Sequence, residues 1–318
     1  MAKCLVTGGA GFIGSHVVDE LIKLKNEVVV LDDLSGGFKE NVNKKAVFVE
    51  GDVCNHALVN KLFKENKFDY VYHLAAEFGR INGEEYYDTL WKTNVVGTRN
   101  VIELQKDHKF KLIFASSSEI YGESQQFPEM HEDIPKKFPI VQHNDYAITK
   151  WVNEMQIMNS EKRNNLETMR LRFFNAYGPG ERYHNYRSVV CLFCYRALHK
   201  LPYQVYKGYN RVFMYIDDFI PTLANVADKF KSGEIVNIGG TEYKSVEEMN
   251  NLILSYLGID DSLVTYLPED KHNVVNKRPN IDKARALLGH NPTITLDEGI
   301  PLTLEWMKDF YKDTIKVK

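Results

Sequence analysis

Short apolar runs and amphipathic stretches alternate along the first 175 residues of the chain. The apolar runs lack strict alternation with polar residues, which is typical of strands buried on both faces of a sheet. They predict strands at 4–6, 27–31, 46–50, 70–73 and 112–116. Apolar residues at helical spacing predict the intervening helices, over 14–24, 56–65, 94–106 and 144–160. Repeated strand–helix units indicate an α/β fold with a doubly wound parallel sheet and right-handed crossovers.

The pattern changes after about residue 175, where the cluster Tyr177-Gly178-Pro179-Gly180 breaks the repeats. Beyond it the sequence predicts a helix over 188–199, an extended piece at 203–206, and strands at 213–216 and 235–238 that would rejoin the sheet. From about residue 243 the chain is mainly helical and more polar. We therefore expect a nucleotide-binding domain over 1–175, rejoined by about 212–240. A smaller, mainly helical domain is expected over 176–211 and 241–318, with the binding crevice between the two.

A glycine-rich loop, VTGGAGFIG at 6–14, joins the first predicted strand to the first predicted helix. Gly8, Gly11 and Gly14 permit a tight turn, close approach of a pyrophosphate and close helix–sheet packing, and the helix N-terminus supplies N–H donors. Asp32 ends the second strand, where a carboxylate accepts hydrogen bonds from both adenosine ribose hydroxyls. It would repel a 2'-phosphate, and the chain has no arginine before position 80 to accept one. The loop therefore predicts a Rossmann-type site for NAD rather than NADP.

Polar residues follow two further predicted strands. Asp52, in Gly51-Asp52-Val53, would accept a hydrogen bond from the adenine amino group, or alternatively would cap the next helix. The run Ser116-Ser117-Ser118-Glu119 ends the strand from 112, and carboxyl ends of such strands face the ligand crevice. A hydroxyl there would bind a reacting sugar hydroxyl and Glu119 would act as acid or base; the alternative is a solvated turn.

Tyr146 and Lys150 are four residues apart and share one face of a predicted helix. A nearby ammonium and a cationic nicotinamide ring both favour the phenolate, and so lower the pKa of a tyrosine from its usual value of about 10. Tyr146 is therefore a candidate base for a sugar hydroxyl.

Composition excludes several other classes of protein. The 318 residues carry 40 Lys and Arg against 43 Asp and Glu, so no basic surplus indicates a nucleic-acid partner. No apolar run is long enough to span a membrane, and the N-terminus lacks a signal peptide. Cys191 and Cys194 form a CxxC without a second ligand pair, so we expect core packing and no metal. A cytoplasmic, reduced protein is predicted.

Together the motifs resemble those of the extended short-chain dehydrogenase/reductase family, in its nucleotide-sugar epimerase/dehydratase branch. The motifs occur in the family's order over nearly the whole chain: TGGAGFIG (7–14), LDDL (31–34), GDV (51–53), HLAAE (73–77), TNVVGT (93–98), SSSEIYG (116–122), YAITK (146–150), RFFNAYGPG (172–180), RVFMYIDD (211–218) and NIGG (237–240).

The resemblance implies residue roles. The NAD site would be lined by Gly8, Gly11, Phe12, Ile13, Asp32, Asp52, Val53, Leu74, Ala75, Asn94, Tyr146 and Lys150. Catalysis would fall to Ser117, Ser118, Glu119, Tyr146 and Lys150, and substrate binding to Glu77, Asn175, Arg211 and Arg278. Arg278 precedes Pro279-Asn280 where the family usually has Pro-Asp, which is a departure from the pattern. A nucleotide-diphosphate sugar is the expected substrate, bound by the smaller domain. Tyr183, His184, Arg187 and Ser188 are expected to border its pocket.

Family members share a first step, in which the tyrosine takes a proton from the sugar hydroxyl and NAD accepts a hydride, leaving a keto sugar. Glu119 resembles the acid that 4,6-dehydratases use at sugar C5, and a 4,6-dehydratase is the predicted activity. An epimerase and a UDP-glucuronate decarboxylase are the alternatives. A non-catalytic NAD-binding regulator is a remote alternative, because such proteins often lose the tyrosine–lysine pair. Family members dimerise through two helices per chain, so we expect a homodimer, with Trp151, Met155 and Met158 at its seam or, alternatively, in the core.

Overall fold

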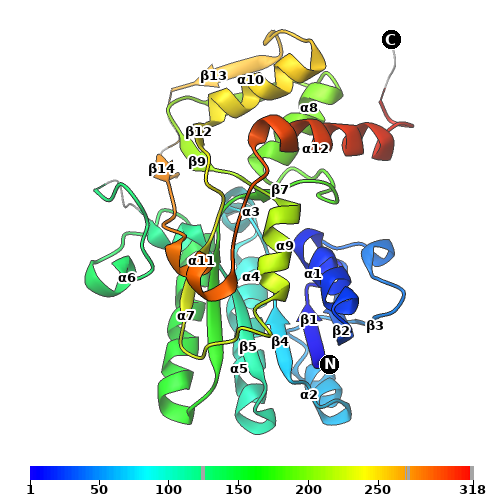
Figure 1. Ribbon diagram of the computed structural model, residues 1–318, viewed down its shortest axis with the longest axis vertical. Helices are drawn as coiled ribbons and strands as arrows, with labels where there is room; N and C mark the ends of the chain where they lie inside the picture. Colours follow the sequence, from blue (N-terminus) through cyan, green and yellow to red (C-terminus); the bar gives the residue numbers. More distant parts are fainter. Residues whose placement is uncertain (123–125, 269, 271–272, 316–318) are drawn as a thin grey trace.

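A parallel sheet of seven strands forms the centre of the molecule (Figure 1). The computed structural model describes residues 1–122, 126–268, 270 and 273–315. The strand order is β11-β6-β5-β4-β1-β2-β3, and every neighbouring pair is parallel. The strands are β1 (Lys3–Thr7), β2 (Glu27–Asp32), β3 (Val47–Glu50), β4 (Tyr70–His73), β5 (Lys111–Ser117), β6 (Thr168–Phe173) and β11 (Ile235–Ile238).

Helices cover both faces of this sheet. One face packs against α1 (Phe12–Lys23) and α9 (Ile216–Ala224), whose Val17, Leu21 and Phe219 join a core with Val6 of β1. The other face packs against α2 (His56–Glu65), α5 (Gly97–His108) and α7 (Asp145–Asn164), where Leu5 of β1 is buried. Successive residues of β1 therefore enter opposite cores, which is why the strand is apolar throughout.

Short elements link these layers. They are η1 (Lys39–Asn41), α3 (Arg80–Glu85), α4 (Tyr87–Trp91), the π-helical turn η2 (Lys92–Val96), η3 (Ser118–Tyr121) and α6 (Ile134–Lys137). The π-helical turn η2 runs directly into α5, so the helix predicted from residue 94 has an irregular first turn.

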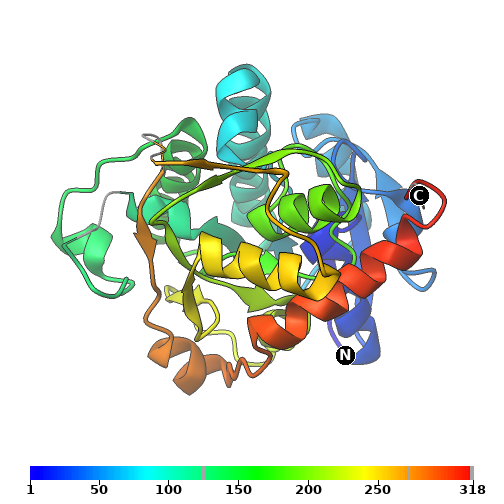
Figure 2. The same ribbon diagram turned by 90° about the horizontal axis from the view of Figure 1, so that it is seen from above.

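The remaining elements lie over the carboxyl ends of the strands (Figure 2), with α10 in yellow and α12 in red. The helices are α8 (Val189–Leu198), α10 (Val246–Leu257) and α12 (Leu296–Phe310). Three small ladders accompany them: β7 (Ala176–Tyr177) with β10 (Met214–Tyr215), β8 (Tyr203–Tyr206) with β13 (Val264–Leu267), and β12 (Tyr243–Ser245) with β9 (Asn210–Val212) and β14 (Asn276–Lys277). From this end of the chain, α11 (Asp282–Leu288) packs back against β11.

The predicted fold class is confirmed, with two differences in its strands. The stretch predicted as a strand at 213–216 contributes β10, which pairs with β7 rather than with the central sheet. Strand β6, beside β5 in that sheet, was not predicted, because Arg170 and Arg172 interrupt its apolar pattern.

The residues expected at a dimer seam fall in two environments. Trp151 packs against the internal cluster around Ile120 and Phe174, whereas Met155 is 39% exposed on α7. The homodimer stays a prediction. None of the helices in the described part of the chain is long and apolar enough to cross a membrane.

Candidate active site

A cavity of about 950 Å³ opens at the carboxyl ends of the central strands, beneath the C-terminal elements. Its walls come from the ends of β1, β2, β4 and β5, from α7, and from the segments that carry α8 and β9. The sites predicted from separate motifs therefore share one space. Most of the predicted residues line it: Gly8, Gly11, Phe12, Ile13, Asp32, Asp52, Val53, Leu74, Ala75, Glu77, Ser117, Ser118, Glu119, Tyr146, Lys150, Asn175 and Arg211.

Two predicted residues do not line the cavity. Asn94 is buried behind it, where its side chain accepts a hydrogen bond from the Glu77 N–H (2.8 Å) and donates to the Glu77 carbonyl (3.1 Å). Asn94 thus fixes the loop after β4 rather than facing a ligand. The Arg278 side chain is 50% exposed and pairs with Glu129 at 3.3 Å. Its neighbour Lys277 lines the cavity instead.

The glycine loop forms a cradle that side chains would fill. Gly8 has a φ of 72°, and a Cβ on it would lie 2.8 Å from the Ala75 nitrogen. Gly11 precedes the first turn of α1, which has no side-chain cap and no acidic residue. The free N–H groups and the positive end of the helix dipole therefore face the cavity, as an anionic pyrophosphate requires.

Asp32 lies at the end of β2 and is 7% exposed. Its two carboxylate oxygens accept hydrogen bonds from the Ala10 and Leu34 N–H groups, each at 2.9 Å. Burial raises the pKa of Asp32, although both N–H groups favour the charged form. Each oxygen keeps a lone pair for a ribose hydroxyl. The donor set and the glycine cradle together fit the adenosine half of NAD.

Two arginines hold the segment between β7 and α8 against this end of the cavity. Arg187 donates to the Gly36 carbonyl at 2.7 Å. Arg182 pairs with Glu40 at 2.8 Å and lies 3.9 Å from the centre of the Phe38 ring. The loop after β2, which begins next to Asp32, is thereby tied to the C-terminal elements.

Tyr146 and Lys150 lie on the first two turns of α7 and are both buried. The Lys150 ammonium donates to the Ala115 carbonyl at 2.9 Å and lies 5.8 Å from the centre of the Tyr146 ring. Burial lowers the pKa of Lys150 to about 8. Burial likewise raises the pKa of Tyr146, and a hydrogen bond with Ser117 opposes that rise. The resting tyrosine is therefore neutral, with a hydroxyl and an ammonium placed to favour its ionisation.

Glu119 follows Ser117 and Ser118 in the turn η3 and forms an ion pair with Lys277 of β14. The Lys277 side chain is 2% exposed and that of Glu119 24%. Burial alone would raise the pKa of Glu119, but Lys277 and Arg211 outweigh it, so the pKa lies below its ordinary value. Glu119 is therefore ionised at neutral pH. None of the sequence motifs includes Lys277, and its position next to Arg278 is what could have indicated it.

Three further polar groups of the cavity come from β9, from the link between β6 and β7, and from the loop after β4. Arg211 is 5% exposed and donates to the Val275 carbonyl and to Asn273 (2.8 and 2.9 Å). Asn175 donates to the Val212 carbonyl at 2.9 Å. Glu77 accepts from Asn82 at 2.9 Å. In the described ranges, no cluster of three His, Cys, Asp or Glu side chains is placed to hold a metal ion.

These features define a dinucleotide-dependent enzyme with a tyrosine–lysine pair beside the cofactor site. The model of the NAD-dependent epimerase/dehydratase family matches residues 4–239, and the chain belongs to this family.

Relatives and solved structures agree with this assignment. The chain is 34% identical to a putative UDP-glucose 4-epimerase of Methanocaldococcus jannaschii, over 96% of this chain and 98% of that protein. It is 29% identical to a UDP-N-acetyl-alpha-D-glucosaminuronate decarboxylase of Bacillus cytotoxicus, over 98% and 99%. The crystal structure of UDP-glucose 4-epimerase from Thermotoga maritima with UDP-glucose superposes with a TM-score of 0.90 at 31% identity, covering 97% and 99%.

Other relatives are UDP-glucuronic acid decarboxylases, and other similar structures are dTDP-glucose 4,6-dehydratases with NAD. The chain is therefore an NAD-dependent enzyme that modifies nucleotide sugars, and its cofactor is NAD.

Proposed function

We propose that this enzyme decarboxylates a nucleotide-linked hexuronic acid by way of a 4-keto sugar. In the first step Tyr146, ionised with the help of the Lys150 ammonium, the Ser117 hydroxyl and the cationic nicotinamide ring, takes the proton of the C4 hydroxyl. NAD, held by Asp32 and the glycine loop, would supply the hydride acceptor for C4 and the hydride for the closing reduction. This chain's own residues bind the sugar, hold the reacting hydroxyl and move its proton.

The ion pair between Glu119 and Lys277 is the observation on which we base decarboxylation, rather than dehydration, as the second step. In a 4-keto uronate, the carboxylate is β to the ketone, so the C5–C6 bond breaks with its electrons moving into the enolate. Carbon dioxide leaves without any acid, and C5 then takes up a proton. The Lys277 ammonium and the Arg211 guanidinium supply positive charge for the substrate carboxylate at this end of the cavity.

The 4,6-dehydratase expected from the sequence remains the second candidate. The position of Glu119 in the same cavity as Tyr146 favours it, because a carboxylate there would take the C5 proton that a C4 ketone acidifies. Loss of water from C6 also needs an acid for the leaving hydroxyl. Glu119 has a lowered pKa and the preceding residue is Ser118, so the pair is poorly suited to that task. The names of several relatives support decarboxylation as well.

The test is incubation of the purified enzyme with UDP-glucuronic acid, UDP-N-acetylglucosaminuronic acid, UDP-glucose, dTDP-glucose and GDP-mannose, followed by mass spectrometry. We expect a uronate to lose the mass of carbon dioxide. Loss of the mass of water from a neutral sugar would establish the dehydratase instead. An unchanged mass with inverted stereochemistry would establish an epimerase.

A variant tests the role of Lys277 separately. Lys277→Met removes the ammonium, and we expect KM for the uronate to rise about tenfold to a hundredfold, the range for a hydrogen bond to a charged group. Lys283, which pairs with Glu234 on the surface, provides the matched control Lys283→Met. An unchanged KM in Lys277→Met would contradict carboxylate binding there.

A further inference from the structure

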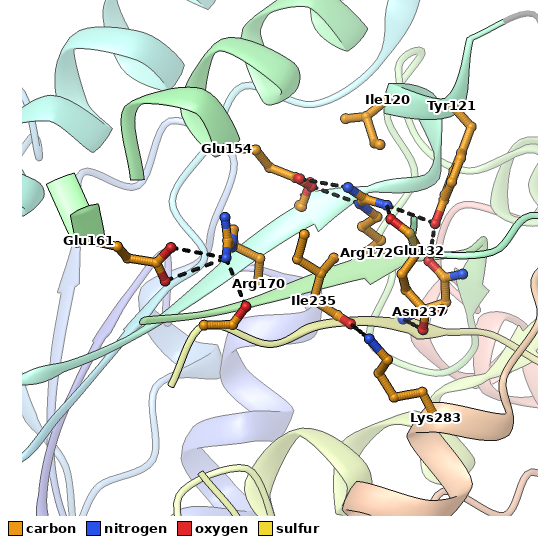
Figure 3. Close-up of polar contacts among 12 residues, drawn as sticks. Ile120, Tyr121, Glu132, Glu154, Glu161, Arg170, Arg172, Ile235, Asn237 and Lys283 are labelled. Atoms are coloured by element: carbon orange, nitrogen blue, oxygen red, sulfur yellow. Dashed lines mark hydrogen bonds and ion pairs between the residues drawn. The ribbon is translucent and has the colours of Figure 1, made fainter. Parts of the chain in front are cut away.

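Two ion pairs join α7 to β6 (Figure 3). Arg170 and Arg172 extend from the same face of β6, and Glu154 and Glu161 lie two turns apart on α7. Arg172 Nη2 lies 2.8 Å from Glu154 Oε2, and Arg170 Nη2 lies 3.1 Å from Glu161 Oε2. The helix that carries Tyr146 is thus paired with the sheet at two points. Only one of these pairs reaches the catalytic turn.

The Glu154–Arg172 pair is bonded to both ends of the turn 116–121. The Ser116 hydroxyl donates to Glu154 Oε1 at 2.6 Å. Arg172 Nη1 donates to the Tyr121 hydroxyl at 2.9 Å. Ser117, Ser118 and Glu119 occupy the positions between these two anchors. The backbone that presents three candidate catalytic groups is therefore fixed, at its start and its end, to one ion pair.

The same carboxylate belongs to the helix of the tyrosine–lysine pair. Glu154 follows Lys150 by one helical turn and Tyr146 by two. The pair consequently connects Tyr146 with Ser117, the residue whose hydrogen bond opposes the effect of burial on the tyrosine pKa. A shift of the helix against the turn would lengthen that contact directly.

The charged and polar groups of this network are buried, and each has hydrogen-bond partners within the protein. Glu154 and Arg172 are 0% and 1% exposed. Burial raises the pKa of Glu154, but Arg172 and Ser116 outweigh burial and hold it below its ordinary value. Arg172 also donates to the Glu132 carbonyl at 2.9 Å, and Tyr121 donates to Asn237 at 2.6 Å. Buried networks of this kind keep a single geometry when each member is satisfied.

The Arg170–Glu161 pair also joins α7 to β6, but its hydrogen bonds differ from those of the Glu154–Arg172 pair. Arg170 donates to Glu161 and to the Gly233 carbonyl, near the other end of the sheet. Its Nε and Nη1 atoms have no hydrogen-bond partner among the described residues. This pair therefore provides a control: a glutamate–arginine ion pair of α7 and β6, with the Glu161 side chain 18% exposed, that lies away from the turn 116–121.

We propose that the Glu154–Arg172 pair is a positioning element for the reaction, which holds Ser117 against Tyr146 by fixing α7 and the turn 116–121 to one carboxylate. The inference rests on the proposed proton transfer at Tyr146. It differs from a purely structural role in one respect. Loss of the pair impairs the chemical step by more than the loss of folding stability accounts for.

The experiment compares Glu154→Gln with Glu161→Gln in the full enzyme with NAD. Folding stability is measured by chemical denaturation, and kcat, KM and single-turnover reduction of NAD are measured with the substrate found above. For Glu154→Gln we expect kcat and NAD reduction to fall about 10²-fold, the cost of a misplacement of about 1 Å, with KM nearly unchanged. For Glu161→Gln we expect kcat near that of the wild type, and the measured stabilities show how much of any fall in kcat unfolding explains.

A second variant keeps the ion pair and removes only the two anchors. Ser116→Ala combined with Tyr121→Phe should lower kcat about tenfold, less than Glu154→Gln does, because the ion pair itself remains. Equal kcat values in the two glutamine variants would overturn the inference. If Glu154→Gln does not fold, wild-type kcat in the double variant would overturn it. Wild-type turnover in Tyr146→Phe would instead overturn the proposed function.

Discussion

Replacement of Lys150 by methionine should stabilise the fold at neutral pH while it abolishes turnover. The side chain is 4% exposed, and burial lowers its pKa from 10.5 to about 8. Each tenfold change in proton affinity corresponds to about 1.4 kcal/mol, so the buried ammonium destabilises the folded state by about 3 kcal/mol below pH 8. The lost hydrogen bond to the Ala115 carbonyl offsets about 1 kcal/mol of this. Lys150→Met should therefore be more stable than the wild type at pH 7.

The pH dependence isolates the charge from other effects of the substitution. Between pH 8 and 10.5 the folded lysine is neutral while the unfolded lysine is still protonated. The unfolded state then binds more protons, so the stability of the wild type rises with pH across this window, and Lys150→Met lacks that rise.

Denaturant titrations at pH 7 and pH 10.5 measure the difference in unfolding free energy between the two proteins. We expect it to shift by about 3 kcal/mol in favour of the wild type on going to the higher pH. A difference that does not change with pH would refute a destabilised ammonium at this position.

Three further predictions concern the cavity. Tyr146→Phe should abolish turnover but retain NAD, because it removes the base and little packing; NAD content and product formation measure the two effects, and turnover within a few-fold of wild type would count against it. Asp32→Ala should weaken NAD binding, measured by calorimetry, and an unaltered affinity would reject the ribose contact. Glu119→Gln should still reduce NAD and still release carbon dioxide from a uronate, because that step needs no acid; accumulation of NADH absorbance would instead support the dehydratase, whose later step uses Glu119.

The sequence predicted the fold class because strand and helix periods along the first 175 residues are regular. It failed at β6, where Arg170 and Arg172 occupy a central strand. A segment with charged residues is normally not predicted to be a buried strand, because an unpaired buried charge costs free energy. Here Glu154 and Glu161 provide the opposite charges. Their partners lie elsewhere in the chain, so local patterning could not reveal that β6 is buried.

Local motifs located most of the cavity lining, because each motif lies at a strand end or a helix start. Asn94 and Arg278 are the exceptions, and Arg278 shows why the sequence alone was insufficient. The motif placed a cation of the cavity at Arg278, but this side chain points to the surface beside Glu129, and Lys277 enters the cavity to pair with Glu119. Lys277 is the last residue of the short strand β14 and Arg278 follows it, and successive residues of an extended chain face opposite sides. A shift of one position therefore exchanges a surface residue for a cavity residue, and the sequence alone does not fix that register.

The two buried lysines described in the cavity, Lys150 and Lys277, differ in whether a carboxylate neutralises their charge. Lys277 has a carboxylate partner in the resting enzyme. Lys150, within the described part of the chain, contacts a carbonyl oxygen and two aromatic rings but no carboxylate. Its positive charge therefore lacks a counter-charge until Tyr146 loses its proton. Tyr146 must lose its own proton before it can take the proton of the C4 hydroxyl, and a nearby uncompensated ammonium favours that ionisation. The instability of the Lys150 ammonium is thus the reason it favours ionisation of Tyr146.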